Sequence, residues 1–348
     1  TDRMLKAFYF QVHRFLARGI PDVSAEVLGV YRVTFALGIA YVLSELSMSS
    51  WGAPGFAIPD RAWLADWQVI RWLANRPDLV GLLEKFTFAT LTFFGVGLWT
   101  RWAYGAVVLN LTIWTLVRLQ HTGTHPWAAL FVTILGLSIV RWSDGFSLDR
   151  QIQRWRGRIP KANSPTRIHG FAMWLPGLVL GTAMCGSSVA KLQGSGFAWI
   201  TNGSVKYHFV TDSLQAPVDW GLWVASHHWV AVGLSAGAIL TEGLLIAAPF
   251  LRSGPLRTLI GIGGFALLMG FFLFQNKLWF AWWLLWMCCF TPWERLDQYF
   301  FESGLDDYYS KSYGDYRKET EPSGYQQESE FNQPKYVYNM PKPYNGME

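Results

Sequence analysis

Eight apolar stretches, separated by shorter polar segments, occupy most of the first 293 residues. Each is about 15 to 25 residues long, the length that an α-helix needs to cross a hydrocarbon layer of about 30 Å. In lipid the helix is favoured because every backbone N–H and C=O group finds a partner within its own segment. The pattern therefore predicts an all-α fold, a polytopic membrane bundle of about eight transmembrane helices. The predicted spans are 26–45, 80–100, 102–119, 125–142, 171–192, 229–251, 257–275 and 278–292.

The amino-acid composition supports a lipid environment. Of 348 residues, 51% are hydrophobic and 15% are charged, whereas a soluble domain carries roughly 25% charged residues. The composition excludes an ordinary soluble protein, and the lipid bilayer is the first expected partner. The three cysteines lie in apolar stretches without the Cys-x-x-Cys spacing of metal sites, so neither a disulfide framework nor a bound metal is predicted.

Basic residues indicate which side of the bundle faces the cytoplasm. Positions 141–167, around the polar segment between the fourth and fifth spans, carry seven Lys or Arg side chains against two acids, Asp144 and Asp149. Because Lys and Arg favour cytoplasmic loops, this segment is expected in the cytoplasm. An even number of spans then places both termini on the cytoplasmic side. The segments expected on the outer face are 46–79, 120–125, 193–228 and 275–277.

Two terminal segments differ from the bundle, which is expected to cover residues 23–293. Residues 1–22 place basic side chains among apolar ones, which indicates an amphipathic helix lying on the membrane surface. Residues 294–348 form a polar, tyrosine-rich cytoplasmic tail with too little aliphatic content to build its own core. We expect this tail to bind other membrane-protein subunits through aromatic contacts. The candidate contact residues are Tyr308, Tyr309, Tyr313, Tyr316, Tyr325, Tyr336, Tyr338 and Tyr344.

Lys191 lies near the outer end of the fifth span, in a helix that is otherwise apolar. An ammonium group in lipid is costly unless it reaches the interface, pairs with an acid or loses its proton, so an intramembrane lysine is a functional candidate. The alternative is that the lysine simply extends its side chain to the outer interface. Glu242 lies deeper, in the sixth span, and both a structural and a catalytic role are open for it.

The remaining polar residues of the spans have simpler interpretations. Arg32, Glu45, Glu84 and Lys85 lie near predicted helix ends, where charged side chains serve as interface anchors or ion-pair partners. Asn110 is expected to form a hydrogen bond between helices.

Several motifs resemble the horizontally transferred transmembrane (HTTM) family, the bacterial branch of the vitamin K-dependent γ-carboxylase superfamily. The main one is Ala-Lys-Leu at 190–192, followed by a glycine-containing turn, an aromatic residue and Tyr207. Supporting motifs, in the family's order, are Gly-Val-Tyr-Arg at 29–32, Gly-Leu-Trp-Thr-Arg at 97–101, Arg-Trp-Ser-Asp-Gly at 141–145 and Thr-Glu at 241–242. The resemblance covers residues 26 to about 293 and implies a bacterial inner-membrane protein.

The resemblance implies that Lys191 is a base that deprotonates vitamin K hydroquinone, and a quinone-type cofactor is expected on this ground alone. It implies His125 as a second catalytic residue, with His121 as the alternative, and Glu242 as a third candidate. His121, Trp199 and Tyr207 are the implied substrate-binding residues. The family's histidine in the seventh span is replaced by apolar residues at 265–269, and no large domain follows the last span. Carboxylation of glutamate itself is therefore not expected.

Two functions of different classes remain open from the sequence. The first is an enzyme with an outer-facing, lysine-based site for a quinone-like or other lipid-soluble substrate. The second is a non-catalytic accessory subunit of a larger membrane complex, such as a respiratory or photosynthetic assembly, that docks through its tail. A transporter is less favoured because no internal repeat is visible. The sequence contains no nucleotide-binding glycine loop or serine elbow, and nothing in it suggests nucleic-acid binding.

Overall fold

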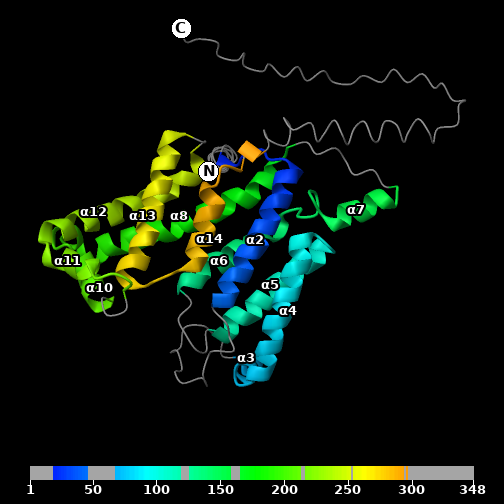
Figure 1. Cartoon of the computed structure of the whole chain (residues 1–348), viewed down its shortest axis with the longest axis horizontal. Helices are drawn as coiled ribbons and strands as arrows, with labels where there is room; N and C mark the ends of the chain where they lie inside the picture. Colours follow the sequence, from blue (N-terminus) through cyan, green and yellow to red (C-terminus); the bar gives the residue numbers. More distant parts are fainter. Residues whose placement is uncertain are drawn as a thin grey trace, which may run out of the picture. The chain divides into compact units, whose positions relative to one another are not determined.

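The computed structural model describes residues 19–45, 67–118, 125–157, 165–212, 216–251, 254–293 and 295–296. Over these ranges the chain is helical without a strand, and Val23 and Thr166 form an isolated antiparallel bridge. The helices are α2 (Ala25–Glu45), α3 (Gln68–Ala74), α4 (Pro77–Val96), α5 (Thr100–Arg118), α6 (His125–Gly136), η2 (Leu137–Ile139), α7 (Leu148–Trp155), α8 (Arg167–Ser195), α9 (Ala198–Thr201), α10 (Val205–Asp212), α11 (Trp220–Ser226), α12 (His228–Leu244), η4 (Leu245–Phe250), α13 (Pro255–Gln275) and α14 (Phe280–Phe290). The predicted all-α class is confirmed for the part of the chain that is described (Figure 1).

Five of these helices are long and apolar enough to cross a membrane, namely α2, α4, α8, α12 continued by η4, and α13. Each of the eight apolar stretches of the sequence contains a helix. The fourth and eighth contain shorter apolar helices, over Trp127–Ile139 and Phe280–Phe290. The third contains α5, which has 19 residues and carries an arginine near each end, Arg101 and Arg118. The predicted amphipathic helix falls almost wholly outside the described residues, and the tail after Leu296 falls outside them entirely.

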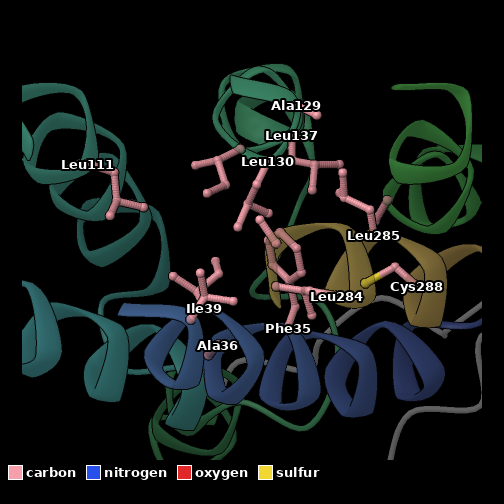
Figure 2. Close-up of a cluster of buried hydrophobic side chains, with 14 of the residues drawn as sticks. Phe35, Ala36, Ile39, Leu111, Ala129, Leu130, Leu137, Leu284, Leu285 and Cys288 are labelled. Carbon is pink, nitrogen blue, oxygen red and sulfur yellow. The ribbon is translucent and has the colours of Figure 1, made fainter. Parts of the chain in front are cut away.

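The hydrophobic core lies between α2, α5, α6 and α14 (Figure 2). Phe35 and Ile39 of α2 are fully buried and converge with Leu130 of α6 and Leu285 of α14. The short helices therefore contribute a core-facing side to the bundle. On its outside the bundle exposes large apolar side chains, such as Trp102 with 82% of its surface exposed. Exposed apolar surface on this scale suits lipid as the surrounding solvent.

At one end of the bundle Arg32 connects its own helix, α2, to two segments that are distant in sequence. The side chain is fully buried, and its guanidinium donates hydrogen bonds to the backbone carbonyls of Gly95, Trp142, Gly145 and Phe146, at 3.3, 2.5, 3.1 and 2.8 Å. These carbonyls lie at the end of α4 and in the loop between η2 and α7. Of the two interpretations of Arg32, the interface anchor is wrong, because the fully buried side chain reaches inward to protein carbonyls. As the ion-pair alternative expects, an acid, Asp149, interacts electrostatically with it.

Asp149 holds the turn between α4 and α5 against the same loop. Its carboxylate accepts hydrogen bonds from the backbone N–H groups of Trp99 and Thr100 and from the Thr100 hydroxyl, each at 2.7 Å. The turn begins at Gly97, which ends α4 in a left-handed conformation with φ of 75°. A side chain there would also collide with Ser147, because an added Cβ would lie 2.5 Å from the Ser147 Cβ. The segments 29–32, 97–101 and 141–145 thus meet in one structural junction.

The start of α8 belongs to this junction as well. His169, which is buried, contacts the carbonyl oxygen of Val23 through Nδ1 and the Asp144 carboxylate through Nε2, both at 3.1 Å. Lys191 lies 22 residues further along the same helix, about 33 Å away at roughly 1.5 Å of rise per residue. Helix α8 therefore connects the junction to the region around Lys191.

Candidate functional site

Close packing against α8 positions the elements of the candidate site. Gly177 and Gly181 are one helical turn apart, and a Cβ added to them would lie 2.5 Å from the Cys289 Sγ of α14 and 2.6 Å from the carbonyl oxygen of Leu245 in η4. Small residues at this spacing allow helix backbones to approach closely in a membrane bundle. The approach of η4 brings α12, which directly precedes it, alongside the second half of α8. Ser188 then donates a hydrogen bond to the carbonyl oxygen of Ile239 in α12 at 3.1 Å.

Lys191 and Glu242 form an ion pair across α8 and α12. The Lys191 Nζ lies 2.5 Å from both carboxylate oxygens of Glu242 and 3.1 Å from the Ser187 hydroxyl oxygen. The Glu242 side chain is 2% exposed and the Lys191 side chain 24%. Burial of a charge is tolerated when it is paired and hydrogen-bonded. The pair explains how an acid and a base can both lie within apolar helices.

Trp199 also lies beside Lys191, which contacts Glu242 and Ser187. The chain leaves α8 through Gly196, with φ of 60°, and enters the short helix α9. This reversal places the Trp199 ring 5.3 Å from the Lys191 Nζ. A cation within about 6 Å of an indole face is attracted by the ring's electron density. Of the two implied substrate-binding residues that the structure describes, Trp199 lies beside Lys191, whereas Tyr207 is not part of the cavity lining described below.

The Lys191–Glu242 pair lines an open cavity of about 1390 Å³. Its lining comes from α6, α8, α9, α10, α12, α13, α14 and the segment between α13 and α14. Apolar and aromatic side chains dominate it, among them Phe271, Trp279 and Trp282. Ligand pockets are typically apolar with a few convergent polar groups. Pockets for drug-sized ligands have volumes of roughly 300–1,000 Å³, and this cavity is larger. The cavity can therefore accept a large lipid-soluble molecule at a site that contains an acid–base pair.

Two further cavity residues, His208 and Lys277, were not singled out from the sequence. Lys277 follows α13, and its ammonium contacts the Asp212 carboxylate at 2.6 Å and the Gln275 amide oxygen at 3.1 Å. His208 lies on α10 and also lines the cavity. The signals available in the sequence were a lysine in a very short turn between two apolar stretches and a histidine directly after Tyr207. Both are weak without the fold, because the partners are distant in sequence.

The surroundings of His208 favour its neutral form. Partial burial, the positive charge of Lys277 and, more weakly, that of Lys191 lower the pKa of His208 below its usual value of 6.5, while Asp212 opposes the shift. The neutral imidazole has one nitrogen available to accept a proton. At neutral pH His208 is therefore expected to be uncharged.

We expect the titration of His208, followed by nuclear magnetic resonance of histidine-labelled protein, to have its midpoint below pH 6.5. His208→Gln identifies the resonance, and His228→Gln serves as a control on a neighbouring helix. Because protonation is harder in the folded state than in the unfolded state, His208 should reduce stability as the pH falls from above 6.5 through the folded-state pKa. The histidine-containing protein should therefore lose thermal stability relative to His208→Gln over this window. A midpoint at or above 6.5 would contradict the environment described.

The remaining predicted site residues are not brought to the cavity by the described structure. His121 lies outside the described residues, and so does the side chain of His125, although His125 is the first residue of α6. Tyr207 is 61% exposed, is not part of the cavity lining and has the Lys206 ammonium 5.3 Å from its ring centroid. All the tail tyrosines also lie outside the described residues. No group of three His, Cys, Asp or Glu side chains within the described ranges could hold a metal ion.

No protein-family model, curated protein or solved structure matches this chain. An ion-paired lysine and glutamate in the wall of a mainly apolar cavity offer a base and an acid to a bound molecule.

Proposed function

We propose that this chain is an integral membrane protein of the HTTM type that performs acid–base chemistry on a quinone-like, lipid-soluble substrate, with Lys191 as the base. The observation that carries the proposal is the Lys191–Glu242 pair in the wall of a large, mainly apolar cavity. A packed site without a cavity would have favoured a scaffold. The family resemblance of the motif at 190–192 supplies the substrate class.

The cavity lining suits an aromatic, ring-shaped substrate. Phe271, Trp279 and Trp282 provide aromatic surface, and Trp199 lies beside the reactive lysine. Aromatic rings stack favourably in offset or edge-to-face arrangements. A reduced quinone would supply a weakly acidic hydroxyl group, and Lys191 would accept the proton of that hydroxyl.

Glu242 would set the protonation of Lys191. The Lys191 proton would pass to the Glu242 carboxylate before the reaction, which would leave a neutral amine and a neutral acid in contact. The neutral amine has a lone pair that can accept the substrate's proton. This transfer would leave Lys191 as an ammonium beside the hydroquinone anion, and the ammonium would donate a hydrogen bond to the carbonyl oxygen of the protonated Glu242. His208 would pass the proton between the cavity and water.

The proposal includes a topology of about eight spans with both termini in the cytoplasm. The basic segment after the fourth apolar stretch lies next to the structural junction, and Lys191 lies about 33 Å further along α8 at roughly 1.5 Å per residue. That distance is close to the thickness of the hydrocarbon layer. It supports an outer-facing cavity in a bacterial inner membrane, opposite to the basic loops.

The test is the oxygen-dependent conversion of vitamin K hydroquinone to its epoxide by the purified full-length chain in lipid nanodiscs, measured by chromatography. We expect Lys191→Ala to reduce the rate by about 10²-fold or more, the usual effect of losing a general base. Lys85→Ala, which removes an exposed lysine of α4, is the matched control and should retain the rate.

Two outcomes would count against the proposal. Equal rates for the wild-type chain and Lys191→Ala would remove Lys191 from the chemistry. A wild-type chain that neither converts nor binds the hydroquinone would overturn the quinone-like substrate and favour the accessory-subunit hypothesis.

A further inference from the structure

A second cavity, of about 390 Å³, lies between the beginning of α13 and the end of α14. It is separate from the cavity of the Lys191–Glu242 pair, with which it shares no lining residue. Its lining residues are Gly254, Arg257, Thr258, Gly261, Ile262, Phe265, Trp286, Phe290, Pro292 and Arg295. The proposed function makes no use of this cavity.

The lining divides into a basic end and an apolar wall. Arg257, Arg295 and the hydroxyl group of Thr258 form the polar end. The Arg257 guanidinium donates to the carbonyl oxygen of Cys289 at 2.6 Å, which holds it against the end of α14. Ile262, Phe265 and Phe290 belong to the apolar wall. The cavity is thus amphipathic.

The apolar wall has a fixed shape and continues onto the outside of the bundle. The Trp286 indole N–H donates to the Gly261 carbonyl oxygen at 3.0 Å, which sets the position of the ring. Leu259, Ile262 and Phe265 are 64%, 59% and 44% exposed. An apolar chain bound in the cavity could therefore extend along α13 without leaving an apolar surface.

The basic end of this cavity lies on the same side of the bundle as the basic loops. Phe250, just before α13, packs edge-on against Trp174 in the first part of α8, with 5.9 Å between the ring centroids. The start of α8 follows the basic segment that is expected in the cytoplasm. The cytoplasmic leaflet carries anionic lipids, and basic pockets between helices on that side attract their headgroups.

We propose that this cavity is a binding site for an anionic phospholipid, whose phosphate group contacts Arg257 and Arg295 and whose acyl chain lies along Ile262 and Phe265. Arginine guanidinium groups match phosphate oxygens in both charge and geometry. A free phosphate ion would satisfy the basic end alone and would leave the apolar wall without a role. The amphipathic lining therefore favours a lipid over a soluble anion.

The test measures the thermal unfolding of the purified full-length chain in detergent during titration with dioleoylphosphatidylglycerol. We expect the lipid to raise the unfolding temperature, because a ligand that binds only the folded state stabilises it. Dioleoylphosphatidylcholine, which carries no net charge, and inorganic phosphate should each give a much smaller increase. Arg295→Gln should raise the half-saturating concentration of the anionic lipid by about tenfold, the effect of losing one charge-assisted contact.

Two further variants make the result decisive. Arg101→Gln removes an exposed arginine of α5 and should leave the lipid response unchanged. Ile262→Asp places an acid in the exposed part of the apolar wall and should abolish the response. An equal response to phosphate and to the anionic lipid, or an equal response of Arg295→Gln and the wild-type chain, would overturn the proposal. Activity toward a hydroquinone is not measured, so this test stands or fails independently of the proposed function.

Discussion

Replacing Arg32 with methionine is expected to destabilise the folded chain by about 4 kcal/mol or more, since hydrogen bonds to charged groups each contribute roughly 1.5–3 kcal/mol and their buried partners would be left unsatisfied. Arg32 is fully buried and donates to carbonyl groups of Gly95, Trp142, Gly145 and Phe146. The Asp149 carboxylate also interacts electrostatically with it. Methionine fills a similar volume but donates no hydrogen bond.

The measurement is thermal unfolding in nanodiscs, followed by the fluorescence of the tryptophans. At roughly 2–4 °C per kcal/mol for a chain of this order of size, the expected decrease in unfolding temperature is about 10 °C. Arg32→Lys keeps the charge but not the planar donor geometry, and it should recover only a part of the loss. Arg101→Met removes an exposed arginine and should change stability little. A decrease for Arg32→Met no larger than that of Arg101→Met would show that the junction does not depend on this side chain.

Replacing Lys191 with methionine is expected to cost about 3 kcal/mol, because breaking a buried ion pair leaves an uncompensated charge. The group left without its charged partner is Glu242, whose side chain is 2% exposed. The opposite change, Glu242→Leu, should cost only about 1–2 kcal/mol, because Lys191 is 24% exposed toward the cavity and can be hydrated or lose its proton. The two single variants therefore differ in stability although they break the same contact.

The double variant Lys191→Met with Glu242→Leu distinguishes the effect of the pair on stability from its effect on activity. Replacing both members of a buried pair by apolar residues is often neutral, so the double variant should be more stable than the sum of the single costs predicts, by about 1–2 kcal/mol. Its conversion of vitamin K hydroquinone should remain absent. Stability is again measured by thermal unfolding, and additive costs would be evidence that the two side chains are not coupled.

Much of the fold was predictable because hydrophobic periodicity is a local property. The apolar stretches at 26–45 and 171–192 lie within helices α2 and α8. Asn110 was expected to join two helices, and its side-chain amide donates to the Thr90 hydroxyl oxygen of α4 at 3.4 Å. The small helices α7, α9, α10 and α11 were not predicted, since they lie in polar or mixed segments where neighbouring elements and not composition decide the conformation.

The candidate site was predictable in part. Lys191 and Glu242 stand out in the sequence because charged residues in apolar stretches are costly, and each therefore requires an explanation. The sequence does not show that the two residues are each other's partners, since they are 51 residues apart. The carbonyl partners of Arg32 were not predicted for the same reason, because they lie 63 or more residues away and carbonyl groups leave no signal in a sequence.

The sequence by itself determined the helical class, the apolar stretches and the few polar residues that must find partners, because each depends on the composition of a single segment. The tertiary structure decided which partners they found: Glu242 for Lys191, backbone carbonyl groups for Arg32, and a common cavity for Lys191, His208 and Lys277. These contacts depend on how closely α8 packs against α12, η4 and α14. That packing follows from the shapes of all the contacting side chains together and is not a property of any one segment.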